Sequence, residues 1–297
     1  MGPETIAADA PAPAAMDSIA DSLRWAARAL SARSDSPRLD AELLLCKVLD
    51  VPRSALIVRG DDALAAGERR AYAGLITRRL GGAPVAYLTG TREFWSLDLN
   101  VTPDVLVPRP ETEVLVELAL ELLPTGETCS VLDLGTGSGA IALAIAAERP
   151  RALVTGVDVC DRALAVALAN SQKLRLPQMR WRSGSWFEAV PGERFALIAA
   201  NPPYIADADP ALQGLAAEPT LALASGPTGL EALGRIVATA PRHLRPGGWL
   251  LLEHGSTQAD AVAGMLRRRG FLRIRSRADF SGHPRVTLGT IHSPHQE

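Results

Sequence analysis

Residues 131–144 read VLDLGTGSGAIALA. An apolar run that passes through glycines into helix-forming residues predicts a strand, a tight loop and a helix. Glycine lets the backbone turn sharply and approach a ligand closely, and a helix N-terminus behind it attracts polar groups. The loop Gly135, Thr136, Gly137, Ser138 and Gly139 therefore predicts a site for a nucleoside-bearing cofactor, either a dinucleotide or S-adenosylmethionine. The structural alternative is a merely tight turn.

On both sides of this loop the sequence alternates between strand-like and helical segments. Apolar runs at 131–134, 152–157, 195–199 and 249–253 predict strands. Such alternation is typical of an α/β fold with a mostly parallel sheet covered on both faces, whose ligands bind beyond the carboxyl ends of the strands. Asp158 ends the second run, about 20 residues past the glycine loop, where an acidic side chain meets ribose hydroxyls. It could equally cap the helix that follows.

A second loop, Asn201-Pro202-Pro203-Tyr204, follows the third strand. Proline has no N–H and holds the preceding residue extended, so this loop has few donors and free carbonyls. The side-chain oxygen of Asn201 and the carbonyl of Pro202 suit the two protons of an NH2 group, and the Tyr204 ring suits its flat face. We expect Asn201, Pro202 and Tyr204 to act in catalysis, and the whole loop, Pro203 included, to bind the substrate.

The chemistry of a planar nitrogen fits this loop. Its lone pair is delocalised, and hydrogen bonds to its protons return electron density to it. Positioning and electrostatics matter more here than a dedicated base, since the proton becomes acidic once a methyl group is attached. We therefore predict no essential His or Glu base. The alternative interpretation of the loop 201–204 is a rigid turn without a functional role that happens to follow a strand.

Before this α/β region the residue pattern of the chain changes twice. Residues 1–17 are rich in Ala and Pro and predict a disordered tail, whereas 18–88 show helical periodicity and predict a small all-helical domain. Residues 89–108 alternate apolar and polar side chains and predict a β-hairpin linker with Pro103-Asp104 as its turn. Residues 109–292 would form the catalytic domain.

The composition of the chain limits the classes of function that it can have. The 297 residues carry 31 Lys and Arg against 33 Asp and Glu, which gives no electrostatic footprint of a nucleic-acid binder. Three widely spaced cysteines and five histidines without ligand spacing predict neither a disulfide framework nor a metal site. No window predicts a membrane span or a signal peptide, which indicates a reduced, cytoplasmic setting.

Several segments together resemble one known family, the protein-(glutamine-N5) methyltransferases of peptide-chain release factors. The resemblance extends from about Ile19 to Ile291 and rests on RxFWSL-like and PRPETE-like motifs, the two loops above, and two short acidic motifs. In this chain these are Arg92-Glu93-Phe94-Trp95-Ser96-Leu97, Pro108-Arg109-Pro110-Glu111-Thr112-Glu113, Glu218-Pro219 and Leu252-Glu253-His254-Gly255.

The resemblance implies a Rossmann-like methyltransferase domain, preceded by a helical domain that contacts the release factor and by a hairpin linker. It implies that S-adenosylmethionine is bound by Gly135 to Gly139 and Asp158, with Trp186 beside the adenine. Asn201 would bridge the cofactor to the substrate, the glutamine of the release factor's Gly-Gly-Gln motif, which would pack on Tyr204. We expect a monomer that binds neither membrane nor, stably, nucleic acid.

One residue departs from the family pattern. Ser185 stands where the family usually has an acidic residue. It could accept from the adenine amino group, but without charge assistance, so we expect weaker cofactor binding.

Four alternatives remain at this point. A nucleic-acid adenine-N6 methyltransferase faces the same planar NH2 with a similar loop, but needs a basic surface and a flipped base. A ribosomal-protein glutamine methyltransferase would lack the segment 108–113. A non-catalytic S-adenosylmethionine-binding module has no need of a complete acceptor loop, and an NAD oxidoreductase would need a hydride-transfer acid or base.

Overall fold

A computed structural model of the chain describes residues 17–292, which divide into two compact units at Gly90 and Thr91. The expected disordered tail, except for its last residue, lies outside the described residues.

The first unit is helical, as predicted. Its helices are α1 (Ile19–Leu30), α2 (Pro37–Leu49), α3 (Arg53–Val58), α4 (Ala66–Leu80) and α5 (Val85–Thr89). They bury a small core of their own, made chiefly of leucine and isoleucine side chains with Tyr72. Pro37 begins α2, as expected of a residue whose missing N–H costs nothing in a first helical turn.

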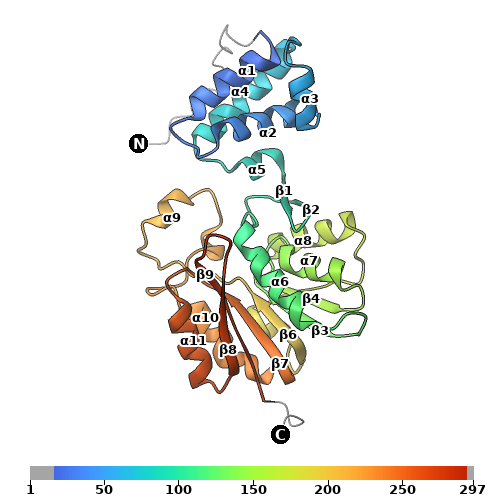
Figure 1. Ribbon diagram of the computed structural model, residues 1–297, viewed down its shortest axis with the longest axis vertical. Helices are drawn as coiled ribbons and strands as arrows, with labels where there is room; N and C mark the ends of the chain where they lie inside the picture. The colour runs from blue at the N-terminus through green and yellow to red at the C-terminus, as the bar shows by residue number, and fades with distance from the viewer. Residues whose placement is uncertain (1–16, 293–297) are drawn as a thin grey trace. The chain divides into compact units, whose positions relative to one another are not determined.

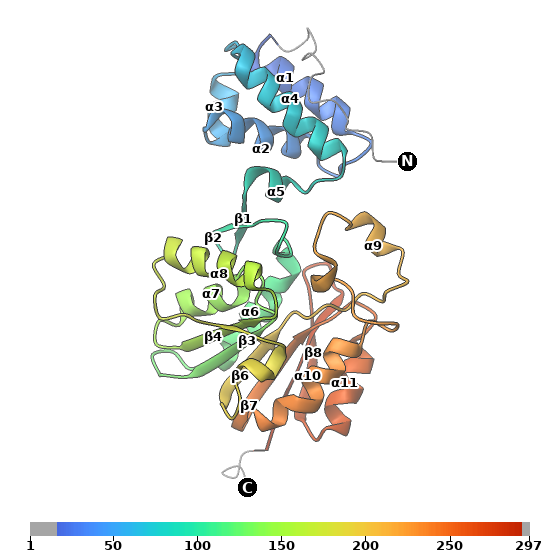
Figure 2. The same cartoon turned by 180° about the vertical axis from the view of Figure 1, so that it is seen from behind.

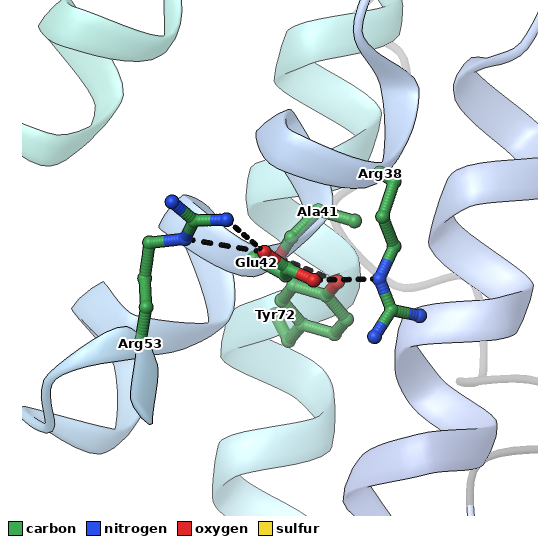
Figure 3. A network of polar contacts seen from close by, with 5 residues as sticks. All are labelled: Arg38, Ala41, Glu42, Arg53 and Tyr72. Carbon is green, nitrogen blue, oxygen red and sulfur yellow. Dashed lines mark hydrogen bonds and ion pairs between the residues drawn. The ribbon is translucent and has the colours of Figure 1, made fainter. Parts of the chain in front are cut away.

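A polar network joins the helices of this unit (Figure 3). The carboxylate of Glu42 on α2 accepts from Arg38 at 2.7 Å and from Arg53 on α3 at 2.6 Å. The Tyr72 hydroxyl, on α4, donates to the carbonyl of Ala41 at 2.9 Å. This hydrogen bond satisfies the hydroxyl of a fully buried side chain.

The second unit begins with the predicted β-hairpin, formed by β1 (Thr91–Phe94) and β2 (Leu97–Asn100). The predicted turn at Pro103-Asp104 is wrong, because the chain reverses at Trp95 and Ser96, whose φ angles are 52° and 58°. Two positive φ values suit the two-residue turn that matches strand twist. Acidic side chains support it: Glu113 accepts from the Trp95 N–H, and Glu93 from the Ser96 N–H.

A seven-stranded sheet, within the described residues, forms the centre of this unit in the order β5-β4-β3-β6-β7-β9-β8. All neighbours are parallel except β9, which is antiparallel to both β7 and β8. The strands are β3 (Ser130–Leu134), β4 (Leu153–Asp158), β5 (Arg180–Ser183), β6 (Phe195–Ala200), β7 (Leu244–Glu253), β8 (Leu272–Ala278) and β9 (Pro284–Thr290). The mostly parallel α/β fold is therefore confirmed.

Helices cover both faces of the sheet (Figures 1 and 2). On one side lie α6 (Glu113–Leu122), α7 (Ala140–Glu148) and α8 (Asp161–Lys173). On the other lie α10 (Glu231–Thr239) and α11 (Ala259–Arg268). Alternate strand residues feed the two cores: Val131 packs in the core with α6 and α7, and Leu132 in the core with α10 and α11.

Shorter elements complete the second unit. They are the 3-10 turns η1 (Pro110–Thr112), η2 (Trp186–Ala189), η3 (Thr220–Ala222) and η4 (Ala240–Arg242), and the short helix α9 (Ala211–Gly214).

The sheet register brings the two predicted loops together. Leu134 pairs with both Val157 on β4 and Ala200 on β6, so the carboxyl ends of these strands lie at one edge. Ala200 in turn pairs with Leu252 on β7. The glycine loop, Asp158, the acceptor loop and Glu253 therefore leave the sheet side by side.

Candidate active site

The glycine loop is held against the end of β4. The N–H groups of Gly135 and Thr136 both donate to the carbonyl of Val157 at 2.9 Å. Gly135 and Gly139 have φ angles of 72° and 84°, which glycine adopts without strain. Gly139 is the N-cap of α7, and a Cβ there would stand 3.0 Å from Trp181. Backbone conformation and space both require glycine at this position.

Asp158 points at the same loop. Its Oδ2 accepts from the Gly137 N–H at 2.9 Å, and its Oδ1 accepts from the Cys160 N–H at 2.9 Å. Cys160, not Asp158, is the N-cap residue of α8. These two bonds fix the carboxylate while each oxygen keeps a lone pair for a further donor.

Trp186 lies close to the first glycine of the loop. A Cβ on Gly135 would lie 3.5 Å from the Trp186 ring, so the bare backbone of this glycine lets the indole lie close. Trp186 itself has a φ of 50°, an uncommon conformation for a bulky residue. Ser185 precedes it and is the N-cap residue of the short turn η2.

A cavity of about 760 Å³ opens at this edge of the sheet. Its walls combine both predicted loops with segments 103–112 and 219–227, and they include Gly135, Thr136, Gly137, Ser138, Asp158, Ser185, Trp186, Asn201 and Pro203. Of the remaining predicted site residues, Gly139, Pro202 and Tyr204 do not line it. Gly139 lies under the loop as the helix cap, and Pro202 is buried.

The side chain of Asn201 is oriented by a residue from the segment before α6. Its Nδ2 donates to the hydroxyl of Thr112 at 3.1 Å. Thr112 is 4% exposed and lines the same cavity. With one Nδ2 hydrogen bound to Thr112, Oδ1 is the acceptor of this amide that remains for a ligand, beside the second Nδ2 hydrogen.

Tyr204 lies behind the loop and packs against the core with α10 and α11. Its carbonyl accepts from Gln258 Nε2 at 3.0 Å, and Gln258 Oε1 accepts from the Gly255 N–H at 2.9 Å. Desolvation raises the pKa of the Tyr204 hydroxyl to about 12, which keeps it a neutral donor. Gln258 therefore ties the end of the acceptor loop to the segment after β7.

An ion pair between a buried carboxylate and a partly exposed guanidinium joins two walls of the cavity. Glu218 is 6% exposed and accepts from the Arg109 guanidinium and, at 3.1 Å, from the Val107 N–H. Arg109 lines the cavity, as does Pro219, which follows Glu218. The pair holds the segment before α6 to the loop between β6 and α10.

Two acids are fully buried at this edge. Desolvation raises the pKa of Asp133 to about 7, although the Thr136 hydroxyl donates to it at 2.6 Å. Desolvation likewise raises the pKa of Glu253 to about 7, against the hydroxyls of Thr112 and Tyr204, which lower it. Neither acid lines the cavity. The sequence predicted only that Glu253 ends a strand. It did not predict the raised pKa of either acid.

The described residues hold no group of three or more His, Cys, Asp or Glu able to bind a metal. None of the helices within residues 17–292 combines the length and apolarity of a membrane span. His254, at 0% exposed, directs its ring nitrogens to Gly255 O and Thr287 Oγ1, and burial lowers its pKa. It is a neutral structural residue.

Comparison with known proteins agrees with this architecture. The PrmC N-terminal domain family matches residues 21–90, and the methyltransferase small domain family matches residues 112–261. The release factor glutamine methyltransferase of Xylella fastidiosa (strain Temecula1) is 50% identical over 85% of this chain and 92% of its own length. That of Salmonella typhimurium is 46% identical over 86% and 93%.

A solved structure supports the fold. The T. thermophilus 16S rRNA N2 methyltransferase, in complex with AdoMet and guanosine, aligns with a TM-score of 0.52 at 20% identity, over 68% of this chain and 50% of its own. At this identity the likeness concerns the fold alone. The relatives above, matched over nearly their whole length, decide the family: this chain belongs to the release factor glutamine methyltransferases.

Proposed function

We propose that this enzyme transfers the methyl group of S-adenosylmethionine to the side-chain nitrogen N5 of the glutamine in the Gly-Gly-Gln motif of peptide-chain release factors. The observation that carries the proposal is the shared cavity, in which a glycine loop suited to a nucleoside and an asparagine suited to an amide lie on one wall each. Family membership supplies the substrate class.

The cavity residues fit the cofactor. The backbone of Gly135 to Ser138 presents a wall without bulky side chains, and Asp158 offers acceptor oxygens to ribose hydroxyls. Trp186 offers an apolar plate for the adenine, and Ser185 an acceptor for its amino group. When bound, S-adenosylmethionine supplies an electrophilic methyl group on a sulfonium sulfur.

The acceptor loop would hold the substrate amide. Asn201 Oδ1 and the carbonyl of Pro202 would receive the two NH2 protons, and the loop's prolines keep competing donors away. Withdrawing density from these protons returns it to the nitrogen, which improves a weak nucleophile. Tyr204 would support the amide plane from behind the loop.

The proposal assigns no base to His254, whose two ring nitrogens are already hydrogen-bonded, or to Glu253, whose side chain is buried. The chain's contribution is orientation: a nitrogen held in line with the methyl group gains most from fixed geometry. After transfer the nitrogen is acidic, and its proton would pass to solvent water, so that no protein base is needed.

We assign the docking of the release factor to the helical domain, residues 18–88, with 89–108 as the linker and 109–292 as the catalytic domain. The separate core of the helical unit supports this division.

One assay tests the proposal. Purified enzyme is incubated with S-adenosylmethionine labelled in its methyl group and, in parallel, with release factor, ribosomal protein and DNA. We expect label in the release factor only, lost when the glutamine of its Gly-Gly-Gln motif is replaced. Label in DNA or in ribosomal protein alone would overturn the substrate, and no label in any of them would overturn the activity.

A further inference from the structure

Glu253 is the last residue of β7 and is 1% exposed. Its Oε2 has no hydrogen-bond partner among the described residues. A buried carboxylate in this state is costly, and replacing it with an apolar residue would often be neutral or favourable. No step of the proposed reaction uses it, and it does not line the cavity. Its position calls for a physical reason.

The sheet places Glu253 next to the acceptor loop. Ala200 on β6 pairs with Leu252 on β7, so Asn201 and Glu253 are the residues that follow at two neighbouring strand ends. Thr112 reaches the same point from the segment before α6, a helix that packs on β6 and β7. The Thr112 hydroxyl accepts from Asn201 Nδ2 at 3.1 Å. It also lies near enough to Glu253 to lower the pKa of that carboxyl group, although no donor is within hydrogen-bond distance of Glu253 Oε2.

A count of protons orders these three groups. A threonine hydroxyl has one hydrogen to donate and lone pairs with which to accept. Thr112 already accepts from Asn201 Nδ2, so its own hydrogen is free for another acceptor. An ionised carboxylate can only accept, which makes Glu253 the partner that sets the direction of the bond.

We propose that Glu253 is a positioning residue for methyl transfer. Its carboxylate accepts a hydrogen bond from the Thr112 hydroxyl, so the Thr112 oxygen can only accept from Asn201 Nδ2, and Asn201 Oδ1 is thereby turned toward the substrate. This inference rests on the proposed function and deepens it. It assigns the acceptor loop's orientation to a residue that touches neither cofactor nor substrate.

The same carboxylate serves the other end of the loop. The Tyr204 hydroxyl also lowers the pKa of Glu253, as does the charge of Arg285 on β9, whereas Glu111 in η1 raises it. Arg285 gives its hydrogen bonds to Asp279, at 3.0 and 3.2 Å, so it acts on Glu253 through charge alone. The neighbouring His254 is bound to Gly255 and Thr287.

Protonation of Glu253 would reverse the direction of the hydrogen bond between Glu253 and Thr112. A neutral carboxyl group can itself donate to the Thr112 oxygen, and the Thr112 hydrogen is then free to meet Asn201 Oδ1. Unless the Asn201 amide turns over, the Thr112 hydrogen is then left without an acceptor. Turning over satisfies that hydrogen but presents the Asn201 NH2 to the substrate NH2, two donors face to face. Because burial raises the pKa of Glu253 to about 7, kcat should rise with pH across that value.

The first test removes the hydroxyl. Thr112→Val keeps the branched shape, and we expect kcat for the release factor to fall about tenfold to hundredfold, the size typical of losing an outer orienting partner. Thr112→Ser, which restores a hydroxyl, should recover most of the rate. The matched control is Thr290→Val, another buried threonine on the far end of the same sheet, whose hydroxyl binds only backbone carbonyls. It should leave kcat unchanged.

The second test measures coupling. Glu253→Gln should abolish the rise of kcat with pH, and Thr112→Val should abolish it too, because the carboxyl group then has no path to Asn201. Combined, the two changes should cost little more in kcat than Thr112→Val alone, whereas independent effects would add. Additive losses, an unaltered pH profile in either variant, or full kcat in Thr112→Val would overturn the proposal.

Binding of S-adenosylmethionine to each variant, measured by calorimetry, should stay within about twofold of the wild type and serves as the check on folding. If the wild type itself fails to label the release factor, the proposed function falls. If the wild type is active and Thr112→Val equally so, only the positioning role of Glu253 falls.

Discussion

The guanidinium of Arg109 forms an ion pair with the carboxylate of Glu218, 109 residues further along the chain. The same carboxylate accepts the Val107 N–H, so one buried acid joins two walls of the candidate active site. The pair explains how the segments around 108–113 and 218–219, far apart in the sequence, meet at one site.

Removing Arg109 should therefore damage both stability and activity. Arg109→Met leaves the buried carboxylate of Glu218 without its counter-charge. Because the Arg109 side chain is 35% exposed, the loss should lie between the ~1 kcal/mol of an exposed pair and the ~3–5 kcal/mol of a fully buried one. We expect a melting temperature lower by several degrees and weaker cofactor binding. Arg277→Met is the control, since its pair with Glu121 is exposed and should contribute at most about 1 kcal/mol. Equal melting temperatures of the two variants would contradict this account.

Asn201→Ala should reduce methyl transfer to the release factor by about 10²-fold to 10³-fold, as expected when one group that stabilises the reacting atoms is lost. Asn100→Ala, in the hairpin strand β2, provides an asparagine control outside the cavity lining. Initial rates at saturating release factor would measure both. Near-normal transfer by Asn201→Ala would remove the acceptor loop from the mechanism.

Ser185→Asp should tighten S-adenosylmethionine binding, because a charged acceptor binds the adenine amino group more strongly than a hydroxyl does. We expect the dissociation constant to fall about threefold to tenfold, equivalent to about 1 kcal/mol. Ser185→Asn, similar in size but uncharged, should gain less. Titration calorimetry decides, and an unchanged or weaker dissociation constant for Ser185→Asp would refute the assignment of Ser185 to the adenine.

The buried carboxyl group of Glu253 predicts a pH-dependent stability. Its pKa is raised from an ordinary 4.5 to about 7, so the folded chain keeps this proton while the unfolded chain has lost it. Stability from this group is complete below about pH 4.5 and is lost as the pH rises to about 7, a change on the order of 3 kcal/mol.

Glu253→Gln removes this titration. Relative to the wild type, the variant should therefore gain melting temperature between about pH 4.5 and 7 and hold that gain above pH 7. Asp133, also buried, titrates in both proteins and cancels from the comparison. A difference in melting temperature that does not change with pH would show that the carboxyl group is not desolvated as described.

Local pattern was sufficient to predict much of the fold. Strands β3, β4 and β6 are apolar because helices cover both faces of the sheet. Each of them is followed by a segment that the sequence marks as part of the site. The strands β5, β8 and β9 were missed. In the edge strands β5 and β8, alternating arginines hide the apolar signal. The hairpin turn was misplaced because Trp95 and Ser96 adopt positive φ without glycine.

The cavity could be predicted only in part. Asp158 and Asn201 stand at strand ends, which parallel topology places at one edge, so their meeting was foreseeable. The partners of Asn201 were not, because the bond to Thr112 spans 89 residues and depends on where the segment before α6 returns to the sheet. The ion pair of Arg109 with Glu218 is hidden in the same way.

Locating the transferred methyl group distinguishes the glutamine side-chain nitrogen from every other acceptor. Release factor incubated with the enzyme and S-adenosylmethionine would be digested, and fragment-ion mass spectrometry would assign the added methyl to one residue. We predict a single methyl group on the side-chain nitrogen of the Gly-Gly-Gln glutamine, absent when Asn201→Ala replaces the wild type. A methyl group on any other residue, or an unmodified glutamine in the presence of active enzyme, would contradict the account.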